Sequence, residues 1–197
     1  MFNVVLYEPE IPANTGNIGR TCVVTGSRLH LVGPLGFSLD DRLLHRAGLG
    51  YWDSLDLCVY QSWDEFLEKN GLAVGQPEPR LHLLTKKARR TYAEARYKDG
   101  DFLVLGREST GIPEDVLATW PGSCERIPML PDATALDNAE TWAAAEGAPS
   151  DHVALHAQDI CGNFIDPEDY RISALNLSNA AAIVLYEALR QTGFAGM

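Results

Sequence analysis

Short, mostly apolar runs recur along the chain, and polar or glycine-bearing segments separate them. Each run is four to six residues long, which is typical of a β-strand and too short for most helices. Runs without polar alternation are typical of the interior strands of a parallel sheet, which are buried on both faces. The pattern predicts strands at residues 2–7, 29–32, 55–60, 80–85, 102–106 and 126–129.

Between the predicted strands, apolar residues recur at helical spacing. They do so from Ile18 through Cys22 to Gly26, a residue type that often ends a helix. Because Pro9 and Pro12 precede this segment, we expect a loop between the first strand and the first helix. Further helices are predicted at 40–47 before Gly48, after the capping-box residues Ser62 and Glu65, and after Pro113.

A long final helix is predicted to begin at Ser178, whose hydroxyl can cap it, and to end before Gly193. Strands that alternate with helices predict an α/β fold, in which a mostly parallel sheet carries helices on both faces. The length of 197 residues suits a single domain. The apolar residues of the final helix lie on one face: Ala181, Val184, Leu185, Ala188 and Leu189.

Residues 133–171 interrupt this alternation. They include eight acidic residues and one basic residue, Arg171, and they exceed the usual length of a connection in an α/β domain. We interpret them as an acidic insertion within one domain that spans 1–197; a lid, a helical excursion and a partner-binding arm are alternatives. Within it, His152, His156 and Asp159 have the spacing of a metal-binding helix face. No fourth ligand is evident, and we expect no metal.

The formal net charge of −11 disfavours a phosphate-rich partner, although the acidic insertion carries much of that charge. Two groups of basic residues remain, and each is either an RNA contact or a solvated helix face. The groups are Lys86, Lys87, Arg89 and Arg90, and Arg42, His45 and Arg46.

No apolar run approaches the roughly 18 residues needed to cross a membrane, and no basic region with an apolar core opens the chain. The four cysteines are far apart and form no C-x-x-C pair, which fits buried free thiols. These features predict a cytoplasmic protein.

Three polar segments follow apolar runs: 14–20 (NTGNIGR), 106–111 (GRESTG) and 176–180 (NLSNA). Open parallel sheets place their ligand sites at the carboxyl ends of strands. We therefore expect these three turns to converge on one site, although each by itself could be a helix cap.

The longer segment 8–20 (EPEIPANTGNIGR), together with 105–108 and 176–180, resembles the SPOUT superfamily of RNA methyltransferases. Within it, the chain is most similar to the tRNA ribose 2′-O-methyltransferases of the wobble nucleotide, position 34, in leucine tRNA. The similarity covers 1–132 and 172–195. The resemblance implies a SPOUT fold with a C-terminal trefoil knot, S-adenosyl-L-methionine as cofactor, tRNA as partner, and a homodimer whose active site is completed near the interface.

By this resemblance, the cofactor would contact eight positions, mostly through backbone groups. Gly106 would let the backbone approach the adenosyl group without an intervening Cβ, and turn geometry alone is the alternative. Glu108 is expected to anchor a loop by accepting backbone N–H groups rather than to transfer protons. The eight positions are Leu84, Thr85, Gly106, Glu108, Ile127, Met129, Ala174 and Leu175.

The resemblance assigns Arg20 to activation of the ribose hydroxyl. Because a guanidinium stays protonated, we interpret Arg20 as a donor that holds the target phosphate and stabilises the developing alkoxide. A structural ion pair with Glu8 or Glu108 is the alternative. Asn17 and Ser178 are further catalytic candidates, and the candidate substrate ligands are Asn14, Asn176 and Asn179, although residues of these types can also cap helices.

Two other functions remain open. The motifs serve the cofactor and the hydroxyl rather than an RNA sequence, so ribosomal RNA or another tRNA position could be the substrate. A non-catalytic RNA- or cofactor-binding module would result if the insertion blocked the pocket. A dinucleotide-binding domain is disfavoured, because no G-x-G-x-x-G follows a strand at the start of a helix.

Overall fold

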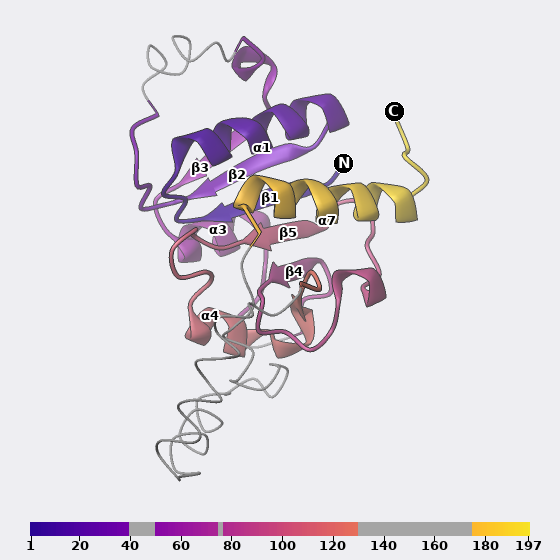
Figure 1. Cartoon of the computed structure of the whole chain (residues 1–197). Coiled ribbons are helices and arrows are strands. Elements are labelled where there is room, and N and C mark those ends of the chain that lie inside the picture. Colours follow the sequence, from indigo (N-terminus) through magenta and orange to yellow (C-terminus); the bar gives the residue numbers. More distant parts are fainter. Residues whose placement is uncertain (40–49, 75–76, 130–174) are drawn as a thin grey trace, which may run out of the picture.

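The computed structural model describes residues 1–39, 50–74, 77–129 and 175–197. Six parallel strands form one sheet in the order β3-β2-β1-β5-β4-β6 (Figure 1). The α/β prediction is confirmed, and the first five predicted strands are correct to within two residues at each end. The strands are β1 (Asn3–Tyr7), β2 (Arg28–Val32), β3 (Leu57–Tyr60), β4 (Leu81–Leu84), β5 (Phe102–Leu105) and β6 (Cys124–Glu125).

The sixth strand is displaced from its predicted position at 126–129. β6 ends at Glu125, and Arg126 makes only an isolated bridge to Thr91. Pro128 offers no backbone N–H to a ladder, which explains why pairing stops before it. The expectation that the strand covers 126–129 is therefore wrong.

The described ranges also contain four α-helices and three short 3₁₀ helices, and all but the C-terminal α7 lie between strands. The α-helices are α1 (Pro12–Thr25), α3 (Trp63–Asn70), α4 (Glu114–Thr119) and α7 (Leu177–Gln191). The 3₁₀ helices span Trp52–Ser54, Tyr92–Glu94 and Pro121–Ser123. The predicted helix at 40–47 lies outside the described residues.

Helix α1 begins six residues earlier than expected. Pro12 occupies the first helical position, after Ile11 in an extended conformation. A proline fits there because its missing N–H would have no helical partner and its φ is already helical. The first polar motif is therefore part of a helix rather than a turn, and neither Asn14 nor Asn17 caps it.

Two predicted caps have different outcomes. Ser62 accepts a hydrogen bond from the Glu65 N–H at 3.2 Å, which confirms the cap of α3. For α7, the cap is Asn176, whose side-chain oxygen accepts from the N–H of Ser178 at 2.9 Å. The prediction that Ser178 caps this helix is wrong, because the helix already begins at Leu177.

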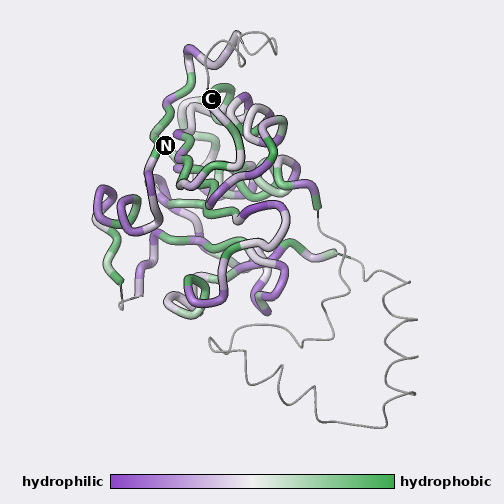
Figure 2. The backbone as a smooth tube through the Cα atoms, turned by 90° about the vertical axis from the view of Figure 1, so that its left-hand side faces the viewer, coloured by the Kyte–Doolittle hydropathy of each residue, from purple (hydrophilic) through white to green (hydrophobic). Residues whose placement is uncertain are grey.

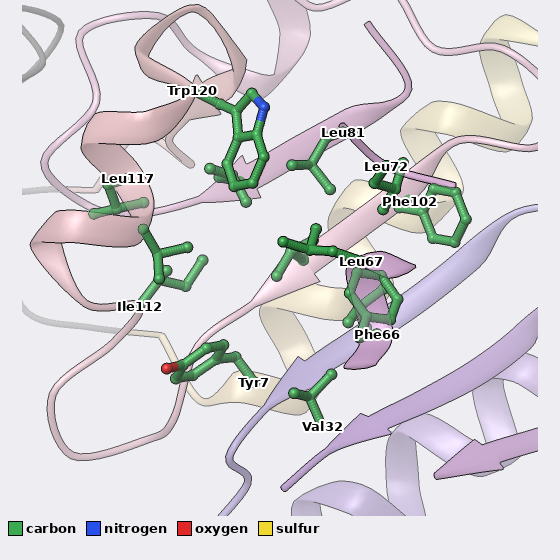
Figure 3. Close-up of a cluster of buried hydrophobic side chains, with 14 of the residues drawn as sticks. Tyr7, Val32, Phe66, Leu67, Leu72, Leu81, Phe102, Ile112, Leu117 and Trp120 are labelled. Carbon is green, nitrogen blue, oxygen red and sulfur yellow. The ribbon is translucent and has the colours of Figure 1, made fainter. Parts of the chain in front are cut away.

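Helices cover both faces of the sheet, as predicted. Side chains alternate along a strand, so Val4 and Leu6 of β1 pack toward α1 and α7, whereas Val5 and Tyr7 pack toward α3 and α4. Helices α1 and α7 lie side by side on their face (Figure 1). In the core on the opposite face, side chains of both smaller helices pack onto the strands (Figure 3). Phe66 and Leu67 of α3 and Leu117 of α4 lie in the same cluster as Leu81 of β4 and Phe102 of β5.

Along the helices, the tube in Figure 2 changes between hydrophobic and hydrophilic colours, as helices with one buried side require. None of the helices in the described ranges is long and apolar enough to cross a membrane. The acidic insertion at 133–171 lies outside the described residues, and so does the chain path that the expected trefoil knot requires.

Candidate active site

A continuous set of hydrogen bonds joins the three polar motifs. The side-chain N–H of Asn14, on α1, donates to Oε1 of Glu108 at 3.0 Å. The amide of Asn176 donates to Oδ1 of Asn14 at 2.9 Å, and Asn176 in turn accepts from Ser178. The prediction that three distant segments converge is therefore confirmed.

A second clamp holds the loop after β1 against the loop after β5. Glu108 accepts from the backbone N–H of Glu10 at 2.9 Å. In return, Glu10 accepts from the N–H of Ser109 at 3.0 Å and from its hydroxyl at 2.8 Å. Glu108 thus anchors a loop through a backbone N–H, as expected, and both of its oxygens already accept hydrogen bonds.

Gly106 is required by the turn that follows it. A Cβ at this position would lie 2.2 Å from the backbone nitrogen of Ile112 and 2.4 Å from the carbonyl carbon of Gly111. The loop therefore folds back directly over Gly106, and Gly111 adopts a φ of 73°, which favours glycine. This observation favours the turn-geometry explanation for Gly106.

The carboxylates beside α1 already have partners. Glu8 lies 2.6 Å from the Arg107 guanidinium, and Glu108 is held by the bonds described above. Arg20 forms no ion pair with either acid among the described residues. The alternative in which Arg20 is a structural ion pair with Glu8 or Glu108 is therefore wrong.

A cavity of about 570 Å³ lies where the motifs meet. Its volume is in the range of small-molecule and cofactor sites. Asn14 and Asn176 line it, and Ala174 lies outside the described residues. Seven of the eight candidate cofactor positions also line it: Leu84, Thr85, Gly106, Glu108, Ile127, Met129 and Leu175.

The cavity suits a ligand with a flat apolar part and polar ends. Leu84, Leu105 and Ile127 provide apolar walls, and all six residues of the 106–111 loop also line the cavity. Lys86 and Lys87 bring positive charge to its rim, although Lys87 also pairs with Glu114. These residues fit an adenosyl group with an attached amino acid.

Arg20 and Asn17 lie outside this cavity. Both are exposed on α1, and Arg20 is six residues beyond Asn14, about 9 Å further along the helix axis. The Arg20 guanidinium lies 4.9 Å from the centre of the Tyr51 ring, whose hydroxyl donates to the carbonyl of Gly16. Burial raises the pKa of Tyr51, and the Arg20 cation opposes that rise.

Ser178 and Asn179 also lie outside the cavity, and Asn179 is exposed. Tyr51 and Arg107 were absent from the candidate site residues, and Lys86 was named only within the first basic group. Lys86 directly follows Leu84 and Thr85, so its place in the chain could have indicated it. The contact between Tyr51 and Arg20 depends on packing across 30 intervening positions, which no local pattern indicates.

The first basic group does not form a helix face. Residues 85–91 are a non-helical turn segment, in which Lys87 pairs with Glu114 and Arg90 lies 2.7 Å from Glu125. The second group, with Arg42, His45 and Arg46, lies outside the described residues, as do the histidines of the suggested metal face.

The SpoU rRNA Methylase family matches residues 1–144 of the chain. The tRNA (cytidine(34)-2′-O)-methyltransferases of Saccharophagus degradans and Escherichia coli K12 are 38% and 36% identical to it. These alignments cover 100% of this chain and 99% and 97% of the two relatives.

Two solved structures agree with this similarity. A candidate RNA methyltransferase from Bacillus anthracis superposes with a TM-score of 0.73 at 38% identity, over 100% of this chain and 98% of that chain. A structure that addresses 2-OH methylation of C/U34 on tRNA superposes with a TM-score of 0.69 at 33% identity, over 98% and 97% of the two chains.

Proposed function

Because the chain belongs to the SpoU rRNA Methylase family, we propose that it transfers a methyl group from S-adenosylmethionine to the ribose 2′-oxygen of nucleotide 34 in tRNA. The observation that carries the proposal is the set of bonds from Glu108 through Asn14 to Asn176, which brings three distant motifs around one cavity. Leucine tRNA is the proposed substrate. A tRNA substrate would place the reaction in the cytoplasm. The free thiols of Cys22, Cys58 and Cys124 are in keeping with this reducing compartment.

The cavity is the proposed cofactor site. Leu84 and Ile127 would pack against the adenosyl group, and backbone groups of Thr85 and of 106–111 would bond its polar edges. When bound, S-adenosylmethionine supplies an electrophilic methyl group on a sulfonium. The protein's main task is then to hold the ribose hydroxyl in line with that methyl group.

Arg20 is the proposed catalytic donor. As a permanent cation it would hold the target phosphate and stabilise negative charge on the ribose oxygen. The Tyr51 ring beneath the guanidinium restricts where Arg20 points. Asn17, exposed on the same side of α1, is proposed to contact the ribose, as are Asn179 and Ser178 at the start of α7.

We further propose that two copies associate through the outer faces of α1 and α7. Three large apolar side chains are exposed there: Val24 at 62%, Ile183 at 37% and Tyr186 at 44%. Arg20 lies four residues before Val24, so it is on the same face of α1. A second copy on this face would therefore cover the surroundings of Arg20. We propose that this brings Arg20 near the cavity of one of the two copies.

The proposal is tested by incubating the purified protein with S-adenosylmethionine and tRNA from cells that lack wobble 2′-O-methylation. Nuclease digestion and mass spectrometry then locate the modified ribose. We expect a 2′-O-methyl group at nucleotide 34 of leucine tRNA and none when that nucleotide is 2′-deoxy. A product in ribosomal RNA or at another tRNA position would replace the proposed substrate, and no 2′-O-methyl product in any RNA would contradict the activity.

A further inference from the structure

A buried group of ionisable side chains lies outside the cavity, between β4, β5 and β6. Glu125 is completely buried, and its Oε1 lies 2.7 Å from both Nδ1 of His82 and the guanidinium of Arg90. Its Oε2 accepts from the Tyr97 hydroxyl at 2.7 Å. The other ring nitrogen of His82 lies 3.1 Å from Asp101, which is 2% exposed. We call these five residues the His82 cluster.

The backbone of the same residues supports one wall of the cavity. The N–H of Thr85 donates to the carbonyl of Glu125 at 2.8 Å, and Leu84 pairs with Glu125 in the register of β4 and β6. The N–H of Arg126 donates to the carbonyl of Arg90 at 2.9 Å. Ile127 follows directly, and Leu84, Thr85 and Ile127 all line the cavity.

The geometry requires His82 to donate from both ring nitrogens, since each faces a carboxylate. Burial alone would lower the pKa of His82, but its bonds to Asp101 and Glu125 outweigh burial and raise that pKa to about 9. The charged and titratable groups around it are Asp101, which directly precedes β5, Glu125 of β6, and Tyr97, whose ring centre lies 4.6 Å away. Arg90 acts through Glu125, and Arg80 acts through Asp101.

We propose that His82 and Glu125 are positioning residues that hold the wall formed by Leu84, Thr85 and Ile127 in its binding shape, without touching the ligand. Without the His82 charge, Glu125 keeps only Arg90 of its two cations, and a completely buried carboxylate that loses a cation must move or take up a proton. Because the backbone of Glu125 is bonded to Thr85, such a movement would displace the wall. The inference rests on the proposed assignment of this cavity to S-adenosylmethionine.

The test is the affinity for S-adenosylhomocysteine at pH 7.5, measured by isothermal titration calorimetry on the full chain. We expect His82→Phe to raise the dissociation constant at least tenfold. The matched control is His30→Phe, because His30 is 1% exposed, makes two side-chain hydrogen bonds, to Tyr60 and Asn3, and does not line the cavity. The control is expected to stay within twofold of the unsubstituted chain even where it lowers the melting temperature.

A pH series separates positioning from a general loss of packing. Between pH 7.5 and pH 10, the dissociation constant should rise in the unsubstituted chain and in His30→Phe. The factor of this rise should be at least five times larger than in His82→Phe, which has no imidazole to deprotonate at this position. The amino group of the ligand titrates equally in every case. If His82→Phe fails to fold, Glu125→Gln is measured instead, and a tenfold weaker affinity is again expected.

Equal affinity in His82→Phe and the unsubstituted chain, or an equal loss in His30→Phe, would overturn the positioning role. A further variant, Ile127→Trp, fills the cavity. It separates failure of the positioning role from a wrong assignment of the cavity as the cofactor site. Unchanged affinity in Ile127→Trp would overturn the assignment of the cavity and the inference with it. Lost affinity in Ile127→Trp beside unchanged affinity in His82→Phe would overturn the positioning role alone.

Discussion

Two asparagines one turn apart on α1 have different surroundings. Asn14 is 5% exposed and joins Glu108 to Asn176, whereas Asn17 faces solvent. Asn14→Ala should lower the free energy of unfolding by about 1–3 kcal/mol, because it leaves two polar groups without their partner. Asn17→Ala should change it by less than about 0.5 kcal/mol. Urea unfolding of both variants checks this difference, and equal effects would contradict the role of Asn14.

Arg20 is exposed, and its side chain contacts the Tyr51 ring. Arg20→Ala should lower kcat about 100-fold, as for loss of one donor to a developing oxyanion, while the affinity for S-adenosylhomocysteine stays within twofold. Arg28→Ala is the matched control. Arg28 is a half-exposed arginine of β2 that pairs with Asp56 and lies outside the three motifs. Single-turnover kinetics and calorimetry measure both quantities, and a full rate in Arg20→Ala would remove it from the catalytic residues.

At the scale of the element, the 106–111 loop depends on one missing methyl group. Gly106→Ala would place a Cβ within 2.4 Å of two backbone atoms, so the loop that holds Glu108 must shift. We expect a loss of about 1–3 kcal/mol in stability and of S-adenosylhomocysteine binding. Gly122→Ala is the control, because its Cβ would have no neighbour within 4 Å. Thermal unfolding measures the stability of both variants, and calorimetry measures their affinity for S-adenosylhomocysteine. Tight binding by Gly106→Ala would contradict this account of the loop.

The edge strand β6 is held by a charged histidine, so its stability should depend on pH. The pKa of His82 is raised from 6.5 to about 9, so its contribution to stability is fully present below pH 6.5 and is lost as pH rises through 9. We expect a loss on the order of 3 kcal/mol over this range. Urea unfolding at pH 6 and pH 10 should show this loss in the unsubstituted chain and little of it in His82→Phe. An equal loss in both would assign the pH dependence to other groups.

At the scale of the whole molecule, the outer faces of α1 and α7 leave apolar side chains in solvent. Ile183→Asp would put a charge at the centre of the proposed contact and should convert a dimer to a monomer, with loss of methyl transfer. Val74→Asp is the control, because Val74 is 66% exposed and lies outside these helices. Light scattering after size-exclusion chromatography gives the mass. A monomeric unsubstituted chain would contradict the proposed association.

The sequence by itself determined the α/β class, five of the strands, the cap of α3 and the convergence of the three motifs. These features depend on local apolar patterns and on the rule that ligand sites lie at the carboxyl ends of parallel strands. Local patterns were least reliable at ends of elements. Pro12 begins a helix that it was expected to delay, and Asn176 takes the cap expected of Ser178.

Only the tertiary structure decided which side chains meet. His82 and Glu125 are separated by 42 intervening residues and become partners because β4 and β6 are neighbours in the sheet. Tyr51 reaches Arg20 across a similar gap in the chain. Such pairings follow from strand order and packing between distant segments, and neither is encoded in the spacing of residues along the chain.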